Sequence, residues 1–221
     1  MTNLQKRILT SILILPISIY FLISGGYQLI FFLIFIFFLG LHELFNVFKK
    51  TNTKLFLFSI LTLSFCSIYF LSKETYVSKY LLYFAVAISI SSDIGGYIFG
   101  KLFKGKKLTK ISPNKTISGV FGSYFFSFIC LAAFNEYLLN PISTKINVSF
   151  LTGINEILLT IILSTVSQAG DITISYLKRL DKIKDSGKIL PGHGGIFDRI
   201  DGLMFVIILT LLLYQMRFLF L

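Results

Sequence analysis

The chain has 221 residues, of which 55% are hydrophobic and 14% are charged, and its net charge is +11. A soluble domain carries about 25% charged residues, so this composition excludes an ordinary soluble fold. The apolar residues form runs of about 20 residues, the length that crosses the hydrocarbon core of a bilayer as an α-helix. The sequence does not alternate apolar and polar residues as a transmembrane barrel does. It therefore predicts an all-α, polytopic integral membrane bundle, with residues 1–221 forming a single membrane-embedded domain.

Seven membrane-spanning helices are expected from the apolar runs. The N-terminal MTNLQKR and the apolar stretch behind it resemble a signal peptide, but the small-residue cleavage pattern is missing and another span follows at once. We therefore interpret this stretch as a retained first helix. A basic loop at residues 101–115 and a polar connection at 140–149 separate later spans. The expected helices cover residues 8–24, 28–48, 55–71, 80–100, 117–139, 153–182 and 202–221.

The distribution of lysine and arginine predicts the orientation of the bundle. If the N-terminus is cytoplasmic, 17 of the 21 basic residues fall in loops on the cytoplasmic side, as the positive-inside rule requires. The two polar segments, residues 101–115 and 175–201, are then expected to face the cytoplasm. The positive charge is explained by orientation and by attraction of anionic substrates and lipid headgroups. Nucleic acid is not an expected partner.

Two acidic residues lie inside predicted spans. A charge at membrane depth costs about 3 kcal/mol on insertion scales, so it is a functional hypothesis by default. Asp93 lies late in the fourth span among serines and glycines, and the alternative is that it only pairs with a lysine of a neighbouring loop. Asp171 lies late in the sixth span, where helical spacing predicts one shared face with Ser175, Lys178 and Lys182.

Four further polar residues lie near the ends of predicted spans. Asp198 and Asp201 stand three residues apart where the seventh span begins. They either cap that helix or bind a metal ion. His42 and Glu43, near the end of the second span, are expected mainly to pack at the membrane interface.

Residues 175–201 concentrate acids, bases and glycines between two apolar spans. Carboxylates that converge from different helices, surrounded by lysine and arginine, suit Mg²⁺ bound to phosphate groups. The turn at Gly194 and Gly195 would let backbone N–H groups approach a phosphate closely. Phosphoryl and nucleotidyl transfer require mainly this positioning and charge neutralisation. The sequence has no P-loop, zinc or nucleophile-elbow motif.

Two blocks of the sequence resemble a known enzyme family. The first is S-x2-K-R-x4-K-D-x-G-x2-L-P-x-H-G-G-x2-D-R-x-D at residues 175–201. The second is S-D-x-G-G-Y-x2-G-K from residue 92, followed by S-P-N-K-T-x2-G from residue 112. Together they resemble the signatures of the phosphatidate cytidylyltransferases, or CDP-diacylglycerol synthases. The resemblance covers residues 92–202; residues 1–80 are expected to be generic N-terminal helices and residues 81–221 to hold the catalytic helices and loops.

The resemblance implies a nucleotidyl transfer for phospholipid biosynthesis. A phosphatidate oxygen attacks the α-phosphorus of CTP, pyrophosphate leaves and CDP-diacylglycerol forms. The implied cofactor is Mg²⁺, with K⁺ as a further candidate. The metal-binding acids implied by the family are Asp171 and Asp198, and Asp201 is a candidate additional ligand.

The remaining site residues follow from the resemblance and from their chemistry. His193 is expected to donate to phosphate, because a phosphate nucleophile that is ionised at pH 7 hardly needs a general base. The candidate catalytic residues are Asp171, Asp198, Lys178, Asp185 and His193. The candidate substrate-binding residues are Asp93, Ser112, Lys115, Thr116, Ser175, Arg179, Lys184, Gly194, Gly195 and Arg199.

The chain departs from the family pattern in two places, since Ile174 and Ser118 stand where the family often has acids. It also has fewer N-terminal spans. The expected partners are CTP, phosphatidate and membrane lipids, with a homodimer through the small residues of the fourth span as a further candidate. The expected location is the cytoplasmic (inner) membrane, with multiple passes.

Three alternative functions remain open. The nearest is a cytidylyltransferase for another lipid phosphate, such as an ether-lipid analogue. A different class is a transporter that uses Asp93 and Asp171 as ion relays. The third is a binding-only scaffold, which would not need acids at membrane depth.

Overall fold

The protein is all-helical in the part of the chain that the structure describes. This computed structural model describes residues 14, 16–73, 75–109, 111–113, 115–136, 154–187, 189 and 194–216. Among these residues there is no strand, only an isolated bridge between Lys107 and Thr116. Residues 16–24 are helical, and the following helices are α2 (Gly26–Val47), α3 (Thr51–Lys73), α4 (Tyr76–Phe103), α5 (Ile117–Phe134), α7 (Ile154–Leu180) and α8 (Phe197–Gln215).

The helices correspond in order to the seven predicted spans, and the predicted fold class is confirmed. Five of them, α2, α3, α4, α5 and α7, are long and apolar enough to cross a membrane. Helix α8 begins at Phe197, earlier than the expected residue 202, so that Asp198 lies in its first turn. Helix α7 ends at Leu180 and not at Lys182, because Lys182 adopts a left-handed backbone conformation with φ of 58°. The predicted connection at residues 140–149 lies outside the described residues.

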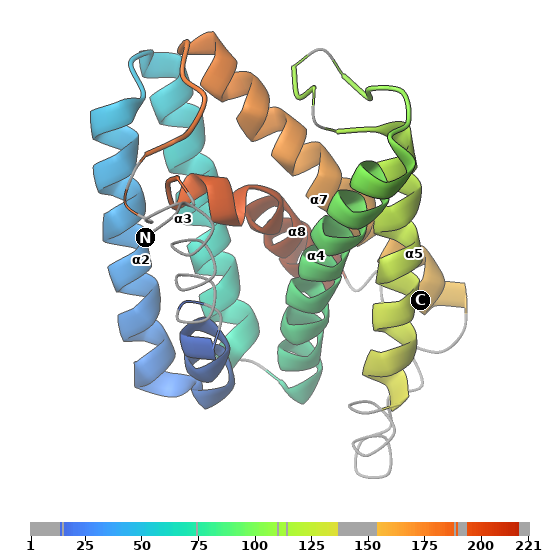
Figure 1. Cartoon of the computed structure of the whole chain (residues 1–221). Helices are drawn as coiled ribbons and strands as arrows, with labels where there is room; N and C mark the ends of the chain where they lie inside the picture. The colour runs from blue at the N-terminus through green and yellow to red at the C-terminus, as the bar shows by residue number, and fades with distance from the viewer. Residues whose placement is uncertain are drawn as a thin grey trace.

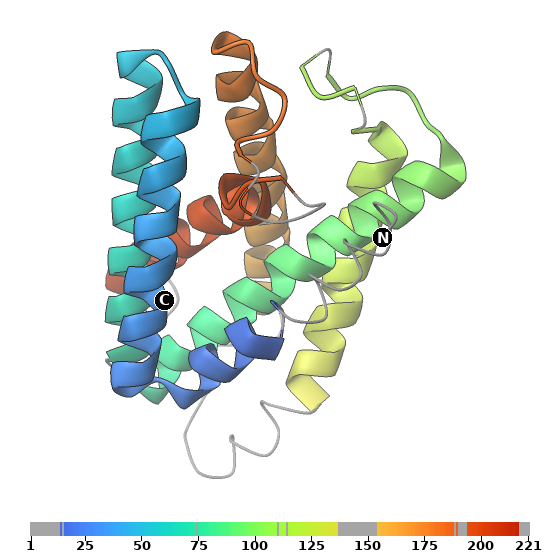
Figure 2. The same ribbon diagram turned by 60° about the vertical axis from the view of Figure 1, so that its left-hand side comes forward.

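Helix α8 lies in the middle of the molecule. The antiparallel pair α2 and α3 lies on one side of it, and α4 and α5 lie on the other (Figures 1 and 2). Helix α8 packs against α3, α4 and α7. Apolar clusters fill the spaces between the helices, and two of them join four helices each. One joins α4, α5, α7 and α8 around Phe84 and Leu163, and the other joins α2, α3, α7 and α8 around Leu57 and Phe197.

Small residues bring α4 and α5 into backbone contact. A Cβ atom on Gly95 would collide with the carbonyl oxygen of Gly122, and one on Gly119 would lie 2.9 Å from the carbonyl oxygen of Gly96. Ser123 donates a hydrogen bond to the Ser92 carbonyl at 2.8 Å. Close approach of this kind is how membrane helices gain packing energy in lipid. The small-residue face of α4, which the sequence offered as a dimer surface, is therefore covered by α5 of the same chain.

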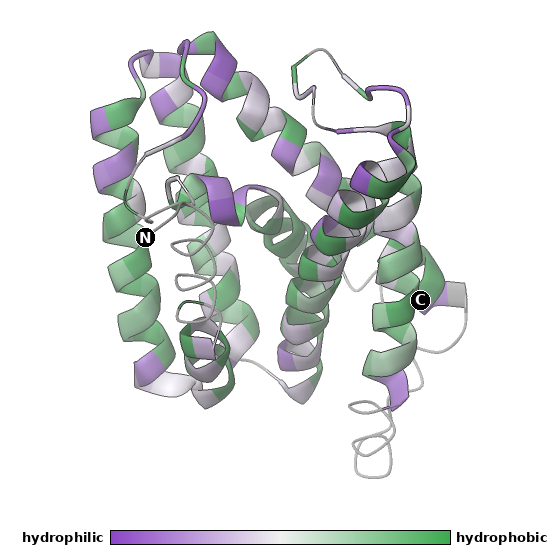
Figure 3. Cartoon of the chain, in the orientation of Figure 1, coloured by the Kyte–Doolittle hydropathy of each residue, from purple (hydrophilic) through white to green (hydrophobic). Residues whose placement is uncertain are grey.

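The segment between α7 and α8 turns back into the bundle. We call residues 181–196 the α7–α8 loop. In Figure 1 its first residues, 181–187, lead from the end of α7 back toward the start of α8 in the middle of the molecule. Hydrophilic residues gather along the end of α7 and at the start of α8, whereas α2 and α5 are hydrophobic along most of their length (Figure 3). The fold thus carries a polar segment into the interior of an apolar bundle.

Candidate active site

Asp171 on α7 forms the first ion pair of the candidate site. The Lys115 ammonium donates to Asp171 Oδ2 at 2.7 Å and to the Gln168 carbonyl at 3.3 Å. Lys115 belongs to the loop between α4 and α5, so this ion pair joins that loop to α7. The other oxygen of Asp171, Oδ1, is buried and receives no hydrogen bond from the described residues.

Three carboxylates from three helices meet at this pair, and we call Asp93, Asp171 and Asp201 the acid cluster. The Asp201 side chain of α8 lies close enough to that of Asp171 for the two carboxylates to interact electrostatically. Asp93 of α4 lies close enough to both for electrostatic repulsion. The positive charges that act on Asp93 are Lys115 and Arg199. The fold therefore brings together Asp93, Lys115, Asp171, Arg199 and Asp201, all of which the sequence proposed as site residues.

Asp198 is held separately, by both of its carboxylate oxygens. Lys178 donates to Oδ1 at 2.6 Å, and each side chain of this pair is only 10% exposed. The backbone N–H groups of Ser186 and Gly195 donate to Oδ2 at 2.9 Å and 3.0 Å. An anion in the first turn of a helix also interacts favourably with the helix dipole. These contacts fix the direction in which α8 begins.

The glycine turn before α8 is shaped by Asp198. Gly194 has a φ of 85°, which disfavours any side chain, and a Cβ atom there would lie 2.6 Å from Asp198 Oδ2. The Gly195 N–H is committed to the same carboxylate. The phosphate-binding role expected of Gly194 and Gly195 stays a prediction. His193 lies outside the described residues.

The loop between α4 and α5 is tied at its base, which fixes Lys115. Backbone bonds join Leu108 N–H to the Lys115 carbonyl and Ile117 N–H to the Lys106 carbonyl, at 2.8 Å and 2.9 Å. The Thr116 hydroxyl accepts from Gly119 N–H at 3.1 Å and so caps α5. Ser112 closes the tip, because its carbonyl accepts from Lys115 N–H at 3.0 Å. Ser112 and Thr116 thus have structural partners, and their substrate-binding roles stay predictions.

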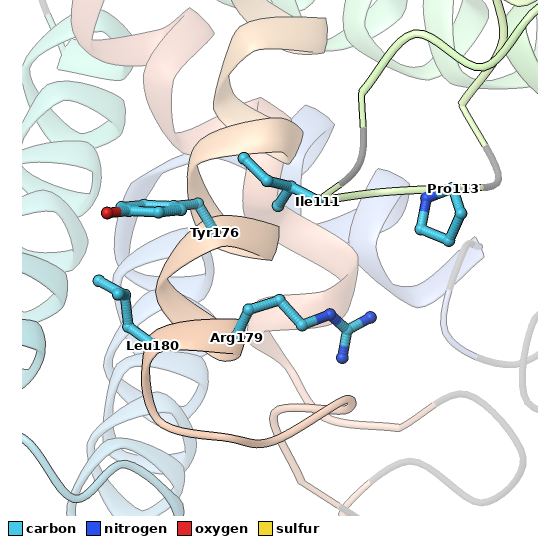
Figure 4. Close-up of a pocket in the computed structure, with 5 residues that line it drawn as sticks. All are labelled: Ile111, Pro113, Tyr176, Arg179 and Leu180. Carbon is cyan, nitrogen blue, oxygen red and sulfur yellow. The ribbon is translucent and has the colours of Figure 1, made fainter.

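A pocket of about 440 Å³ opens between this loop and the end of α7 (Figure 4). The loop contributes Ile111 and Pro113, and α7 contributes Tyr176, Arg179 and Leu180. Arg179 also donates to the Ile183 carbonyl at 3.0 Å. The pocket presents one guanidinium among mostly apolar side chains.

Three other predicted residues lie on α7 and on the α7–α8 loop. Ser175 is half-buried on α7, between Asp171 and Lys178, as the helical spacing predicted. Lys184 and Asp185 are exposed on the α7–α8 loop. The structure therefore does not bring Asp185 into the acid cluster, and its catalytic role stays a prediction.

Glu43 is a site neighbour that the sequence analysis underrated. Its side chain comes from α2, is buried, and accepts from Ile196 N–H at 2.6 Å. It therefore contacts the α7–α8 loop and is no interfacial packing residue. The signal that could have found it is the one used for Asp93, an acid near the end of an otherwise apolar span.

Comparison with known proteins places this site in a family. Residues 48–217 match the family model described as the cytidylyltransferase family, which spans both polar blocks and all three acids of the cluster. The chain belongs to the cytidylyltransferase family. All of the predicted site residues lie inside the matched segment, whereas Glu43 lies outside it.

Similar curated proteins carry a more specific name. A "Phosphatidate cytidylyltransferase" of Staphylococcus aureus (strain COL) is 46% identical over 138 residues, which cover 62% of this chain and 49% of that protein. The protein of the same name from Staphylococcus haemolyticus (strain JCSC1435) is 39% identical over 173 residues, 77% of this chain and 63% of its own. This member of the cytidylyltransferase family therefore spans about half to three fifths of the length of these relatives.

The two departures from the family pattern have local structural reasons. Ile174 is fully buried in the apolar cluster that contains Leu44 and Phe197. An acid in these surroundings would lack a partner for its charge, so isoleucine fits them better. Ser118 accepts from Gly105 N–H at 3.2 Å and thereby holds the α4–α5 loop to α5.

The donor chemistry of the acid cluster fits a divalent cation. Mg²⁺ commonly takes only one or two protein carboxylates, with waters and phosphate oxygens as its other ligands. No donor in the described part of the chain reaches the buried Oδ1 of Asp171, and the Asp201 carboxylate lies close to this acid. Among the described residues no three acids, histidines or cysteines are arranged as a ready set of metal ligands. The expected set of Asp171, Asp198 and Asp201 is thus divided between a carboxylate pair and an acid bound to Lys178.

Proposed function

We propose that the chain transfers the cytidylyl group of CTP to phosphatidate, forming CDP-diacylglycerol and pyrophosphate at the membrane. A phosphate oxygen of phosphatidate forms a new bond to the α-phosphorus of CTP. The bond to the bridging oxygen breaks, and pyrophosphate leaves with that electron pair. Family membership and the names of the relatives support this reaction.

One observation carries the proposal: three acids and two lysines from four segments meet where a polar loop enters an apolar bundle. Asp93, Asp171 and Asp201 come from different helices. Lys115 pairs with Asp171 at 2.7 Å, and Lys178 pairs with a fourth acid, Asp198, at 2.6 Å. A transfer between two phosphate groups needs positive charge beside the phosphates and fixed geometry more than it needs a proton carrier. Lysines that are fixed by ion pairs supply the positive charge and the fixed geometry.

Each residue has a role that its position supports. Lys115 would bind a phosphate of CTP, since it is fixed between the α4–α5 loop and Asp171. Arg179 would bind the lipid phosphate at the pocket of Figure 4, where apolar neighbours suit the glycerol end of the lipid. Asp171 and Asp201 would hold Mg²⁺, which neutralises charge on the phosphates when it is bound. The metal role of Asp198 and a contribution of K⁺ belong to the same proposal.

The site is proposed to face the cytoplasm, from the cytoplasmic membrane. The charge distribution supports this orientation, because the polar segments at residues 101–115 and 175–201 hold 12 of the 21 basic residues. CTP would then reach the site directly from the cytosol, and phosphatidate would reach it from the adjoining leaflet.

The decisive experiment supplies the purified full chain in phospholipid nanodiscs with labelled CTP, Mg²⁺ and phosphatidate. The expected product is CDP-diacylglycerol, and Asp171→Asn should reduce its formation about 100-fold or more. Glu156→Gln is the matched control, because it makes the same acid-to-amide change in the first turn of the same helix. It should retain wild-type activity.

The alternatives are tested in the same preparation. Product formation from an ether-linked lipid phosphate in preference to phosphatidate would change the substrate assignment. If no CDP-lipid forms, and ion flux in proteoliposomes depends on Asp171, the enzyme proposal is wrong.

A further inference from the structure

The α2–α3 pair and the α7–α8 loop exchange hydrogen bonds in both directions. Asp181, at the start of the loop, accepts from the N–H groups of Lys49 and Lys50 at 3.3 Å and 3.2 Å, just before α3 begins. Glu43, near the end of α2, accepts from Ile196 N–H at 2.6 Å, at the end of the loop. The two acids are only 6% and 1% exposed. Both ends of the loop are therefore fixed to one helix pair.

The loop is folded closely around the Glu43 carboxyl group. A Cβ atom on Gly187 would lie 3.0 Å from Glu43 Cδ, and one on Gly195 would collide with Glu43 Oε1. The Ser186 hydroxyl is fully buried and lies against the same Gly195 position. Residues from both limbs of the loop thus contact one carboxylate that comes from outside it.

The peptide groups at these contacts are the ones that hold Asp198. Ser186 N–H and Gly195 N–H both donate to Asp198 Oδ2, and Gly195 precedes the residue whose N–H Glu43 accepts. A shift of the Glu43 carboxylate would therefore move two donors of Asp198 and the first turn of α8. That turn leads directly to Asp201 in the acid cluster.

We propose that Glu43 is a positioning residue for the transfer reaction, acting through the α7–α8 loop to set the directions of Asp198 and Asp201. This inference rests on the proposed function. Glu43 acts as a hydrogen-bond acceptor whose side-chain length places its oxygen at the Ile196 N–H. Its negative charge takes no direct part in the transfer reaction. It lies outside the segment that matches the family model.

Two variants of Glu43 distinguish a role as hydrogen-bond acceptor from a role as a charge, because the two roles predict opposite orders of their activities. Glu43→Gln keeps the length of the side chain and one carbonyl acceptor, but it removes the charge. Glu43→Asp keeps the charge and shortens the side chain by one methylene, so that it no longer reaches Ile196. Positioning predicts that the glutamine variant resembles wild type and that the aspartate variant is impaired. A direct role in binding metal or substrate predicts the reverse.

The test uses the full chain in nanodiscs and two readouts. Hydrogen exchange of the Ser186, Gly195 and Ile196 amides reports whether the loop is held. Steady-state kinetics report kcat and the KM for CTP. For Glu43→Asp we expect faster exchange of all three amides and a fall in kcat of about 10- to 100-fold, because a misplacement near 1 Å has that cost. The KM for CTP should change less.

A control variant on α2 is measured by the same hydrogen exchange and kinetics. Asn46→Ala, on an exposed position one turn along α2, should change neither exchange nor kinetics. The thermal midpoint of Glu43→Gln should stay close to that of wild type, and that of Glu43→Asp should fall by only the few degrees that one unsatisfied N–H group costs. A small fall of this kind separates positioning from loss of fold. An active aspartate variant with an inactive glutamine variant would overturn the proposal, as would loss of kcat without faster exchange. If wild type forms no CDP-diacylglycerol, the proposed function fails. The hydrogen-exchange readout still decides whether Glu43 holds the loop, because it does not depend on activity.

Discussion

The two sides of the bundle are held together by opposite means. On one side α4 and α5 meet backbone to backbone, because Gly95, Gly119 and Gly122 have no side chains to keep them apart. On the other side, the α2–α3 pair and the α7–α8 loop are joined by two buried carboxylates, Glu43 and Asp181, that accept backbone N–H groups. The α4–α5 contact depends on glycines, which have no side chain, whereas the loop contact depends on two carboxylate side chains.

This difference follows from what each side has to bury. Apolar helices in lipid gain no hydrophobic energy from each other, so they associate through close van der Waals packing. A polar loop inside the bundle brings unpaired N–H groups, and each of these costs about 1–3 kcal/mol if it stays unsatisfied. Carboxylates satisfy such donors strongly. The three predictions below separate the two kinds of contact, in order of expected effect.

The largest effect is expected on the polar side, from Lys178→Met. The variant leaves the Asp198 carboxylate buried without its counter-ion, and breaking a buried pair in this way costs about 3–5 kcal/mol. The expected result is a marked fall in the midpoint of thermal unfolding, followed by circular dichroism in detergent. The double variant Lys178→Met/Asp198→Asn should recover part of the lost stability without recovering activity. A single variant as stable as wild type would show that the pair does not hold α8 in place.

A smaller effect is expected on the apolar side, from Gly95→Ala. The new methyl group would meet the Gly122 backbone and lie 2.7 Å from Phe126 Cβ, neither of which can move without separating the helices. Overpacking of this kind costs about 1–3 kcal/mol. Gly40→Ala on α2 is the matched control, because its methyl group meets only the flexible end of Leu61, at 3.2 Å. Equal thermal midpoints for the two variants would contradict the tight α4–α5 contact.

The sequence predicted the helices well because their signal is local. Runs of apolar residues correspond to α2, α3, α4, α5 and α7 within a few residues. The start of α8 was predicted too late, because Asp198 and Asp201 interrupt the apolar run and a hydropathy argument excludes them. Their carboxylates are instead satisfied by long-range partners, such as Lys178 for Asp198, and the linear sequence does not show such partners.

The composition of the site was predicted better than its connections. Depth and charge selected Asp93 and Asp171 before any resemblance was considered, and the structure brings them together. The pairing of Lys115 with Asp171, across 56 positions of the chain, depends on how α4, α5 and α7 pack. Glu43 was underrated for the same reason, since its partner Ile196 is 153 positions away. Local patterns identify which residues are unusual, and only packing decides which of them meet.

The smallest effect is expected from Asp181→Ala, which removes the second acid that holds the loop. Its carboxylate accepts two N–H groups just before α3. Because Lys49 and Lys50 are exposed, water replaces the lost acceptor, so the change resembles loss of a helix cap and should cost about 1 kcal/mol. Asp185→Ala, an exposed acid on the same loop, is the matched control and should leave the thermal midpoint unchanged. Because Asp181 holds the first residue of the loop and Glu43 holds the last, loss of Asp181 should speed amide exchange at Lys49 and Lys50 and leave Ile196 protected. Faster exchange at Ile196 as well would mean that the two acids act as one unit, and the loop would then be released as a whole.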